Sequence, residues 1–347
     1  ATLTCNASTV SLGSGRTSSH ALIINQGGTF VGGTGTHTIG SLNIKNNTNC
    51  KCTLTSGDTT INGENGSTSK AINIEGSNGA VNFSHPTNGT VIITFNGNTD
   101  IKADGTTLAL NSLTINHASA NVTLKSILTC AANLTITAGT LDTDSSNNYA
   151  LTVGTNTDDA GATGHLLILD AGELTCNSST VIVGSVYCQI AAGSNGTGFS
   201  ELNLPDASGS FTVRGPEKNS YVFRLDNQAE CNHNSGTVTF SLTAENHPSI
   251  MDVTSLRGTG VNNILVTQTV SSNSANGVLE FVGSDTVKGN LTLTGNGSQS
   301  CIVDTNFNGA NLTIDGDVTV NNHSTFIKRT TNTGNYSFGG LKLASGS

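Results

Sequence analysis

Tryptophan is absent from this 347-residue chain, proline occurs only four times, and aromatic and charged residues contribute 4% and 11%. A compact globular protein of this length would carry more large apolar side chains than the 35% hydrophobic content allows. Low hydrophobicity can also indicate disorder, but disordered chains combine it with high charge. The low charge and the many β-branched residues therefore exclude a disordered chain. They predict a β-structure whose core is filled by small and medium side chains.

Charge and hydropathy exclude two classes of partner. The net charge of −9 is spread thinly and includes no Lys/Arg cluster that could neutralise phosphates, so we expect no nucleic-acid partner. No apolar run approaches the ~20 residues of a transmembrane helix, so we expect no membrane insertion. The chain has no recognisable signal peptide and starts at Ala1, inside an expected strand. We therefore expect a processed chain or part of a longer one.

The eight cysteines have no CxxC spacing, which argues against a structural zinc site, and we expect no bound metal. Several cysteines end strand-like segments such as Leu3-Thr4-Cys5 and Leu128-Thr129-Cys130. There we expect buried free thiols that behave as small apolar groups. Disulfides between stacked strands are the alternative. Free thiols would indicate folding in a reducing cytoplasm.

A short strand-like motif returns along the chain at a nearly constant interval. Five segments follow this interval: Cys52-Thr53-Leu54, Ile72-Asn73-Ile74, Ile93-Thr94-Phe95, Leu113-Thr114-Ile115 and Leu134-Thr135-Ile136. A second set keeps step between them: Thr59-Thr60-Ile61, Val81-Asn82-Phe83, Ile101-Lys102-Ala103, Val122-Thr123-Leu124 and Leu141-Asp142-Thr143. Near the end, Leu291 and Leu312 begin similar segments at the same interval. Two strands per repeat predict an all-β, single-chain parallel β-helix (β-solenoid) of ~20–21-residue turns.

The composition of the sequence changes between residues 199 and 231, where prolines, charged residues and aromatic residues are concentrated. We therefore expect a β-solenoid over residues 1–198 and a lateral excursion over 199–231. Residues 232–347 would then hold the continuation of the solenoid and a C-terminal cap. Residues 3–14 and 174–185 agree at nine of twelve positions, which predicts the same local turn in both places.

The region 199–231 is also the candidate binding site, because aromatic residues beside arginine are typical of binding patches, including those for glycans. The candidate binding residues are Phe199, Phe211, Arg214, Tyr221, Phe223 and Arg224. The alternative is that these aromatic rings fill a local core where the coil changes direction.

The sequence offers little catalytic chemistry. The carboxylate pairs that could serve a glycan-cleaving site are Asp142 with Asp144, Asp158 with Asp159, and Asp170 with Glu173. Asp142 and Asp144 are better explained as part of a solvated turn, since residues 142–148 are all polar, and carboxylate pairs without other catalytic groups commonly lie in loops. A calcium-loop pattern after Asp142 fails, because Asn147 replaces the required glycine and Val153 the bidentate glutamate. No nucleophile, phosphate or dinucleotide motif is present, so we expect no catalytic residues and no cofactor.

Two segments, Asn290–Gly295 and Asn311–Val320, resemble the Asn-Leu-Thr-Val-x-Gly turns of bacteriophage fibre and appendage proteins, particularly those of marine phages. The resemblance implies a virion surface protein, often trimeric, that folds in the host cytoplasm. We therefore expect a non-enzymatic virion structural protein (tail fibre, spike or head decoration) that contributes to host-surface attachment. Its partners would be other virion proteins, further copies of itself, and a host glycan or receptor. The alternatives are a bacterial surface adhesin or self-assembling extracellular filament, and a glycan-degrading tailspike.

Overall fold

The computed structural model describes residues 1–12, 21–46, 49–64, 69–76, 81–105, 107–154, 164–189, 199–214, 221–226, 229–242, 248–253, 258–268, 277–295, 301–305, 311–328 and 334–344. Within these ranges the chain is all-β and contains no helix. The strand pairings described there are parallel, and one antiparallel bridge joins Asp206 to Ser235. These features confirm the predicted all-β class with parallel strands.

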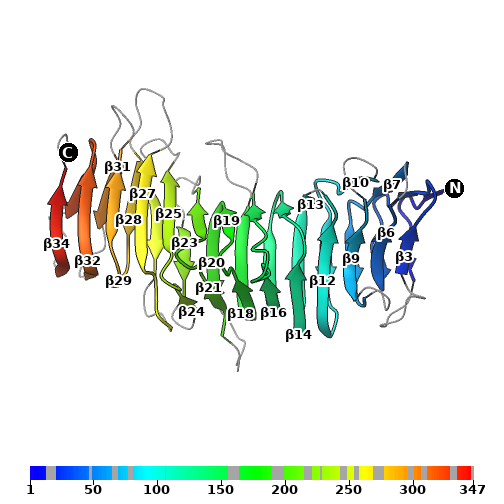
Figure 1. The fold of residues 1–347 in the computed structure, drawn as a ribbon, viewed down its shortest axis with the longest axis horizontal. Helices are drawn as coiled ribbons and strands as arrows, with labels where there is room; N and C mark the ends of the chain where they lie inside the picture. The colour runs from blue at the N-terminus through cyan, green and yellow to red at the C-terminus, as the bar shows by residue number, and fades with distance from the viewer. Residues whose placement is uncertain are drawn as a thin grey trace. The chain divides into compact units, whose positions relative to one another are not determined.

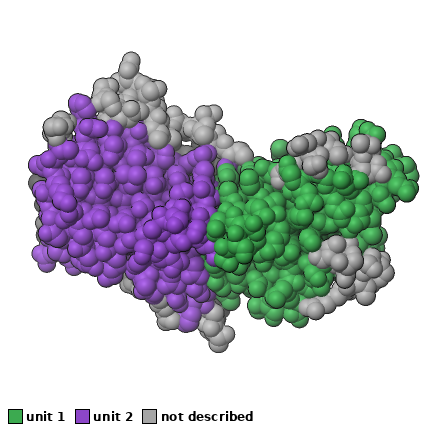
Figure 2. All heavy atoms as spheres, viewed as in Figure 1, with its two compact units in different colours: residues 1–153, 171–175 green, residues 154–170, 176–347 purple. Residues whose placement is uncertain are grey.

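The chain divides into two compact units (Figure 2). Unit 1 comprises Ala1–Val153 with Ala171–Thr175, and unit 2 comprises Gly154–Asp170 with Cys176–Ser347. The predicted boundaries at residues 198 and 231 do not coincide with this division. The described part of 199–231 contributes strands that pair in parallel with their neighbours, so the lateral excursion predicted there is not found among the described residues.

Unit 1 is built from strands that belong to three sheets (Figure 1). They are β1 (Thr2–Thr4), β2 (Val10–Ser11), β3 (Ala21–Ile24), β4 (Thr29–Val31), β5 (His37–Ile39), β6 (Ser41–Ile44), β7 (Cys50–Thr53), β8 (Asp58–Ile61), β9 (Lys70–Ile74), β10 (Val81–Ser84), β11 (Thr90–Ile93), β12 (Gly97–Ala103), β13 (Leu108–Leu110), β14 (Ser112–Leu124), β15 (Leu128–Cys130), β16 (Leu134–Asp142) and β17 (Leu151–Val153).

The chain of unit 1 visits its sheets in a recurring order. Strands β1, β4, β7 and β10 form one sheet, and each is followed by two strands of a second sheet: β2–β3, β5–β6, β8–β9 and β11–β12. A third sheet holds β13, β15 and β17, which alternate with β14 and β16. The early part of unit 1 therefore uses three strands per passage, where the sequence predicted two.

Core residues of unit 1 stack in columns, meaning residues that face each other on successive parallel strands. One column consists of isoleucines that are at most 2% exposed: Ile39, Ile61, Ile93, Ile115 and Ile136. β-Branched side chains favour extended backbone and pack well on a pleated surface. A stack of them builds a narrow core without large aromatic rings, which explains the composition.

The constant register predicted from the repeats is wrong for most of unit 1. Leu113 does pair with Leu134, the next segment of its predicted series. Ile72 instead pairs with Leu42, which precedes it, and with Ile101, which follows it, both separated from it by more than the predicted ~20–21 residues. Ile72 therefore shares no column with Ile93. The segments between strands differ in length. The number of residues between two paired residues therefore varies along the chain, although the strands still pair in parallel.

Unit 2 has the same type of structure. Its strands are β18 (His165–Thr175, whose last five residues belong to unit 1), β19 (Thr180–Val183), β20 (Ser185–Gln189), β21 (Glu201–Asn203), β22 (Ser210–Val213), β23 (Tyr221–Leu225), β24 (Glu230–Asn232), β25 (Thr237–Leu242), β26 (Pro248–Asp252), β27 (Asn263–Gln268), β28 (Gly277–Phe281), β29 (Asp285–Val287), β30 (Leu291–Thr294), β31 (Cys301–Thr305), β32 (Leu312–Asn321), β33 (Thr325–Lys328) and β34 (Tyr336–Leu343).

The register of unit 2 also differs from the predicted one. Leu291 pairs with Val318 in the second half of β32, and Val318 pairs with Leu341. Leu312, predicted to stack on Leu291, pairs with Asp285 and Tyr336 instead. The two Asn-Leu-Thr segments therefore occupy different columns, although both form strands.

The duplicated twelve-residue motif forms the same turn twice, as predicted. Asn6 and Asn177 have φ of 52° and 50°, in the left-handed region that asparagine tolerates. In each copy a serine N–H donates to the carbonyl of the cysteine three residues earlier, at 2.8 Å for Ser8 and 3.0 Å for Ser179. The Cys-Asn turn is thus a local unit that the sequence alone identifies.

Candidate functional site

Two of the predicted binding residues belong to the core of unit 2. Phe211 on β22 and Phe223 on β23 are 0% exposed, and their rings meet edge to face at 6.4 Å. Phe223 also contacts Phe240 at 5.9 Å. Strand alternation turns both rings inward, because each is two residues from another buried side chain, Val213 or Leu225. Their predicted role in binding is therefore wrong, and the core alternative is confirmed for both.

The structure does bring Tyr221 and Arg224 together on the outer side of β23. The Arg224 guanidinium carbon lies 4.9 Å from the centre of the Tyr221 ring, and its Nε lies 3.1 Å from the carboxylate of Asp226. The Tyr187 hydroxyl donates to the Tyr221 carbonyl at 2.6 Å. The arginine charge is thus already balanced within the chain, which leaves it little to offer a ligand.

The other two predicted binding residues lie on different segments. Phe199 precedes β21 and is 38% exposed, whereas Arg214 follows β22 and is half-buried. The Arg214 N–H donates to the Val183 carbonyl at 2.9 Å.

The carboxylate pair Asp142 and Asp144 stabilises a turn. The Asp144 N–H donates to Asp142 at 2.8 Å, and Asp144 itself has a left-handed φ of 66°. Its carboxylate accepts from Ser146 N–H at 3.0 Å, Asn147 Nδ2 at 2.9 Å and Lys125 Nζ at 3.1 Å. Burial opposes ionisation, but these donors outweigh it and lower the pKa of Asp144. A carboxylate held this firmly is suited to structure more than to proton transfer.

The remaining carboxylate candidates follow the same trend. Glu173 accepts hydrogen bonds from Thr140 at 3.0 Å and from Thr175 at 2.9 Å. Asp170 has a left-handed φ of 49° at a bend within β18. Asp158 and Asp159 lie outside the described residues.

All eight cysteines are buried and free, which confirms the expectation for those that end strand-like segments. Burial raises the pKa of Cys52, Cys130 and Cys231 to about 12, so these thiols stay protonated and unreactive. Cys231 faces the core, while the nearby His233 accepts from the Ser235 N–H at 2.9 Å. In the described ranges no group of three His, Cys, Asp or Glu side chains is arranged to hold a metal.

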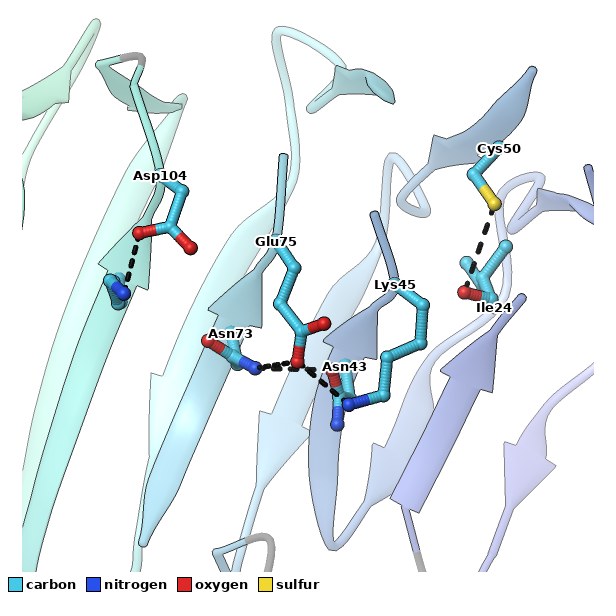
Figure 3. A network of polar contacts seen from close by, with 8 residues as sticks. Ile24, Asn43, Lys45, Cys50, Asn73, Glu75 and Asp104 are labelled. Atoms are coloured by element: carbon cyan, nitrogen blue, oxygen red, sulfur yellow. Dashed lines mark hydrogen bonds and ion pairs between the residues drawn. The ribbon is translucent and has the colours of Figure 1, made fainter. Parts of the chain in front are cut away.

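Unit 1 contains a partly buried polar network at the ends of β6 and β9 (Figure 3). Asn73 Nδ2 donates to Asn43 Oδ1 at 3.2 Å and to Glu75 Oε1 at 2.9 Å. Lys45 Nζ lies 2.7 Å from the same glutamate oxygen. Asn43 and Asn73 are 0% and 3% exposed and face each other on the two parallel strands. The network is a side-chain ladder that ties neighbouring strands together.

A groove crosses three neighbouring loops of unit 1. These loops join β12 to β13, β14 to β15 and β16 to β17, so their flanking strands pair within the same two sheets. The groove has a volume of about 570 Å³. It is lined by Lys102, Ala103, Asp104, Gly105, Thr107, Lys125, Ser126, Ile127 and Tyr149. The groove is thus built on loops that parallel strands hold in fixed positions.

Charges in this groove are paired. Lys102 forms an ion pair with Asp104, which Figure 3 shows at the end of β12, and Lys125 forms one with Asp144. Burial opposes protonation of Lys125, but its hydrogen bond to Asp144 and the nearby negative charges of Asp100 and Asp144 raise its pKa. Each of the two lysines in the groove is therefore paired with a carboxylate of the chain.

The groove was not predictable from the sequence patterns described above. The usable signal was a lysine directly after a core residue in each of two paired strands, in Ile101-Lys102 and Leu124-Lys125. Tyr149 gave no such signal, because the turn between β16 and β17 brings it to the groove.

Comparisons with family models, with curated proteins and with solved structures found no match to this chain. Among the described residues, no helix has the length and apolar character needed to cross a membrane.

Proposed function

We propose that this chain is a parallel β-solenoid and serves as a non-enzymatic structural protein of a bacteriophage particle. It would be a tail fibre, spike or head-decoration protein that contributes to host-surface attachment. The observation that carries the proposal is the isoleucine column of unit 1, with its recurring order of sheets. Such a stack gains stability strand by strand along an axis, which suits an appendage that must be long and stiff.

A structural role is supported by the state of the acidic side chains. The carboxylates of Asp144 and Glu173 accept several hydrogen bonds from neighbouring strands and turns. General acid–base catalysis requires a carboxyl group that can exchange its proton with a substrate. The carboxylates of Asp144 and Glu173 instead stabilise the fold through these hydrogen bonds.

Assembly in a host cytoplasm is supported by the eight free, buried thiols. Proteins that mature in oxidising compartments tend to use paired cysteines as disulfides. The partners would be other virion proteins and further copies of this chain, most simply as a trimer.

The test is whether the chain is present in purified virions. Mass spectrometry of gradient-purified particles should detect it at a fixed ratio to the capsid protein, and antibody labelling should place it at one location on the particle. Its uniform absence from particles would refute the proposal.

A second candidate, a self-assembling filament subunit, is favoured by the apolar columns exposed on β1 and β34. Leu3 belongs to the same column as the buried residues Phe30 and Cys52, yet it is 54% exposed. Leu341 and Leu343 pair with the buried residues Val318 and Val320 of the neighbouring strand, and they are 54% and 69% exposed. Electron microscopy of the purified chain distinguishes the two: filaments that lengthen with concentration, without virus, would favour this candidate.

A further inference from the structure

We propose that the groove lined by Lys102, Asp104, Lys125, Ile127 and Tyr149 binds a neutral oligosaccharide. That the sugar comes from a host surface rests on the proposed function. That the ligand is a neutral sugar is argued from the residues of the groove alone.

The groove is held in place by the backbone of unit 1. The Leu108 N–H donates to the Ile127 carbonyl and the Leu128 N–H to the Ala150 carbonyl, at 2.8 and 3.0 Å. The Ser126 hydroxyl accepts from the Ala103 N–H at 3.0 Å. These hydrogen bonds fix the three loops side by side. The loss of conformational entropy in the loops on ligand binding should therefore be small.

Tyr149 reaches the groove through a defined turn. Asp144 and Asn148 both have left-handed φ, of 66° and 53°, and the Asn148 N–H donates to the Asp144 carbonyl at 2.7 Å. The Tyr149 N–H then donates to the Thr143 carbonyl at 2.9 Å, which closes the loop. The aromatic ring is therefore presented by a rigid loop.

The apolar part of the groove suits the C–H face of a sugar ring. Ile127 is 44% exposed, and Tyr149 lines the same groove. Among the described residues no hydrogen bond engages the Tyr149 hydroxyl. A tyrosine offers both a flat apolar surface and a polar tip, as a hydroxyl-rich ligand requires.

The polar part of the groove favours a neutral ligand. Each lysine has its own carboxylate, so an anionic sugar would meet no uncompensated positive charge. The same paired groups can donate to and accept from sugar hydroxyls without a change in net charge. At about 570 Å³ the groove lies within the ~300–1,000 Å³ of small-molecule sites.

The test is binding by the full chain to defined soluble probes. We would measure saturation-transfer NMR and calorimetry with tetrasaccharides of glucose, mannose, galactose and N-acetylglucosamine, and with the charged tetragalacturonate. At least one neutral probe should bind. Its affinity should fall at least tenfold in Tyr149→Ala and in Ile127→Ala, and change less than twofold in the matched control Tyr221→Ala.

Folding is checked by the unfolding midpoint of each variant. If Tyr149→Ala is destabilised, Ile127→Ala carries the test, because 44% of the Ile127 surface is already exposed to solvent. Failure of every neutral probe at millimolar concentration would overturn the proposal. So would preference for the charged probe, or unchanged binding by Ile127→Ala. Absence of the chain from virions would refute the proposed function and leave this binding result standing.

Discussion

Asn73 donates its side-chain amide to Oδ1 of Asn43 across 3.2 Å, and both side chains are buried on neighbouring parallel strands of unit 1. No described group accepts a hydrogen bond from Asn43 Nδ2, so the ladder ends there. The hydrogen bond between the two buried amides joins β9 to β6, so this pair helps to fix which strands become neighbours.

Removal of the donor should destabilise unit 1. Asn73→Ala leaves the Asn43 carbonyl oxygen without its donor, and we expect a loss of about 1–3 kcal/mol in the free energy of unfolding measured in urea. Asn82→Ala is the matched control, because Asn82 is exposed on β10. The control should lie within about 0.5 kcal/mol of the wild type. Equal losses in both variants would contradict a role for the ladder.

Asp285 should make the stability of unit 2 depend on pH. Burial, and to a lesser degree the charge of Asp252, raise the pKa of its carboxyl to about 7 from 3.8, although the N–H groups of Val253 and Gly283 donate to it. The folded state therefore favours the protonated acid. The stability it contributes is complete below about pH 4 and is lost as pH rises to about 7, by up to about 4 kcal/mol.

The comparison that isolates this effect is Asp285→Asn. The difference in unfolding free energy between wild type and variant should change steadily from pH 4 to pH 7, with the variant relatively more stable at high pH. A difference that is constant across this range would show that the carboxyl does not titrate there.

The thiols should be inaccessible in the folded protein. We expect a thiol-reactive dye at pH 8 to label none of the eight cysteines rapidly, and to label all eight after denaturation without reductant, because none is in a disulfide. Fewer than eight reactive thiols in the denatured chain would indicate disulfides. That result would favour an extracellular origin over assembly in a cytoplasm.

Gly33 should tolerate no side chain. It has φ of 72°, and a Cβ there would overlap the carbonyl oxygen of Asn6 in the neighbouring turn. We expect Gly33→Ala to cost more than about 3 kcal/mol of stability. Gly260→Ala is the control, since its φ is 79° but the nearest atom would be 3.9 Å away. That variant should show only the left-handed strain of about 1–2 kcal/mol. Equal costs would mean that close stacking of the turns is absent.

The sequence was sufficient to predict strands and parallel stacking, but not the register. Leu-Thr-Leu and Leu-Thr-Ile segments are interchangeable in any column, so similarity cannot show that Leu291 stacks on Val318 and not on Leu312. The Cys-Asn turns were predictable because left-handed asparagine is a local signal.

The candidate sites show the same limit. The alternation of Phe211 with Val213 and of Phe223 with Leu225 already indicated that both rings point into the core. The predicted binding role of these rings relied on composition alone and was therefore wrong. The groove depends on three separate loops. Only the strand pairings reveal that Lys102, Lys125 and Tyr149 meet.

The parallel register is tested most directly by cross-linking in the folded protein. Thr292 and Thr319 are half-buried partners that face each other on β30 and β32. A short bismaleimide should therefore join Thr292→Cys to Thr319→Cys rapidly. It should not join Thr292→Cys to Thr313→Cys, because Thr313 lies near the start of β32, roughly 20 Å away along the strand. Efficient linkage of the 292–313 pair with none of the 292–319 pair would contradict the stacking on which the β-solenoid rests.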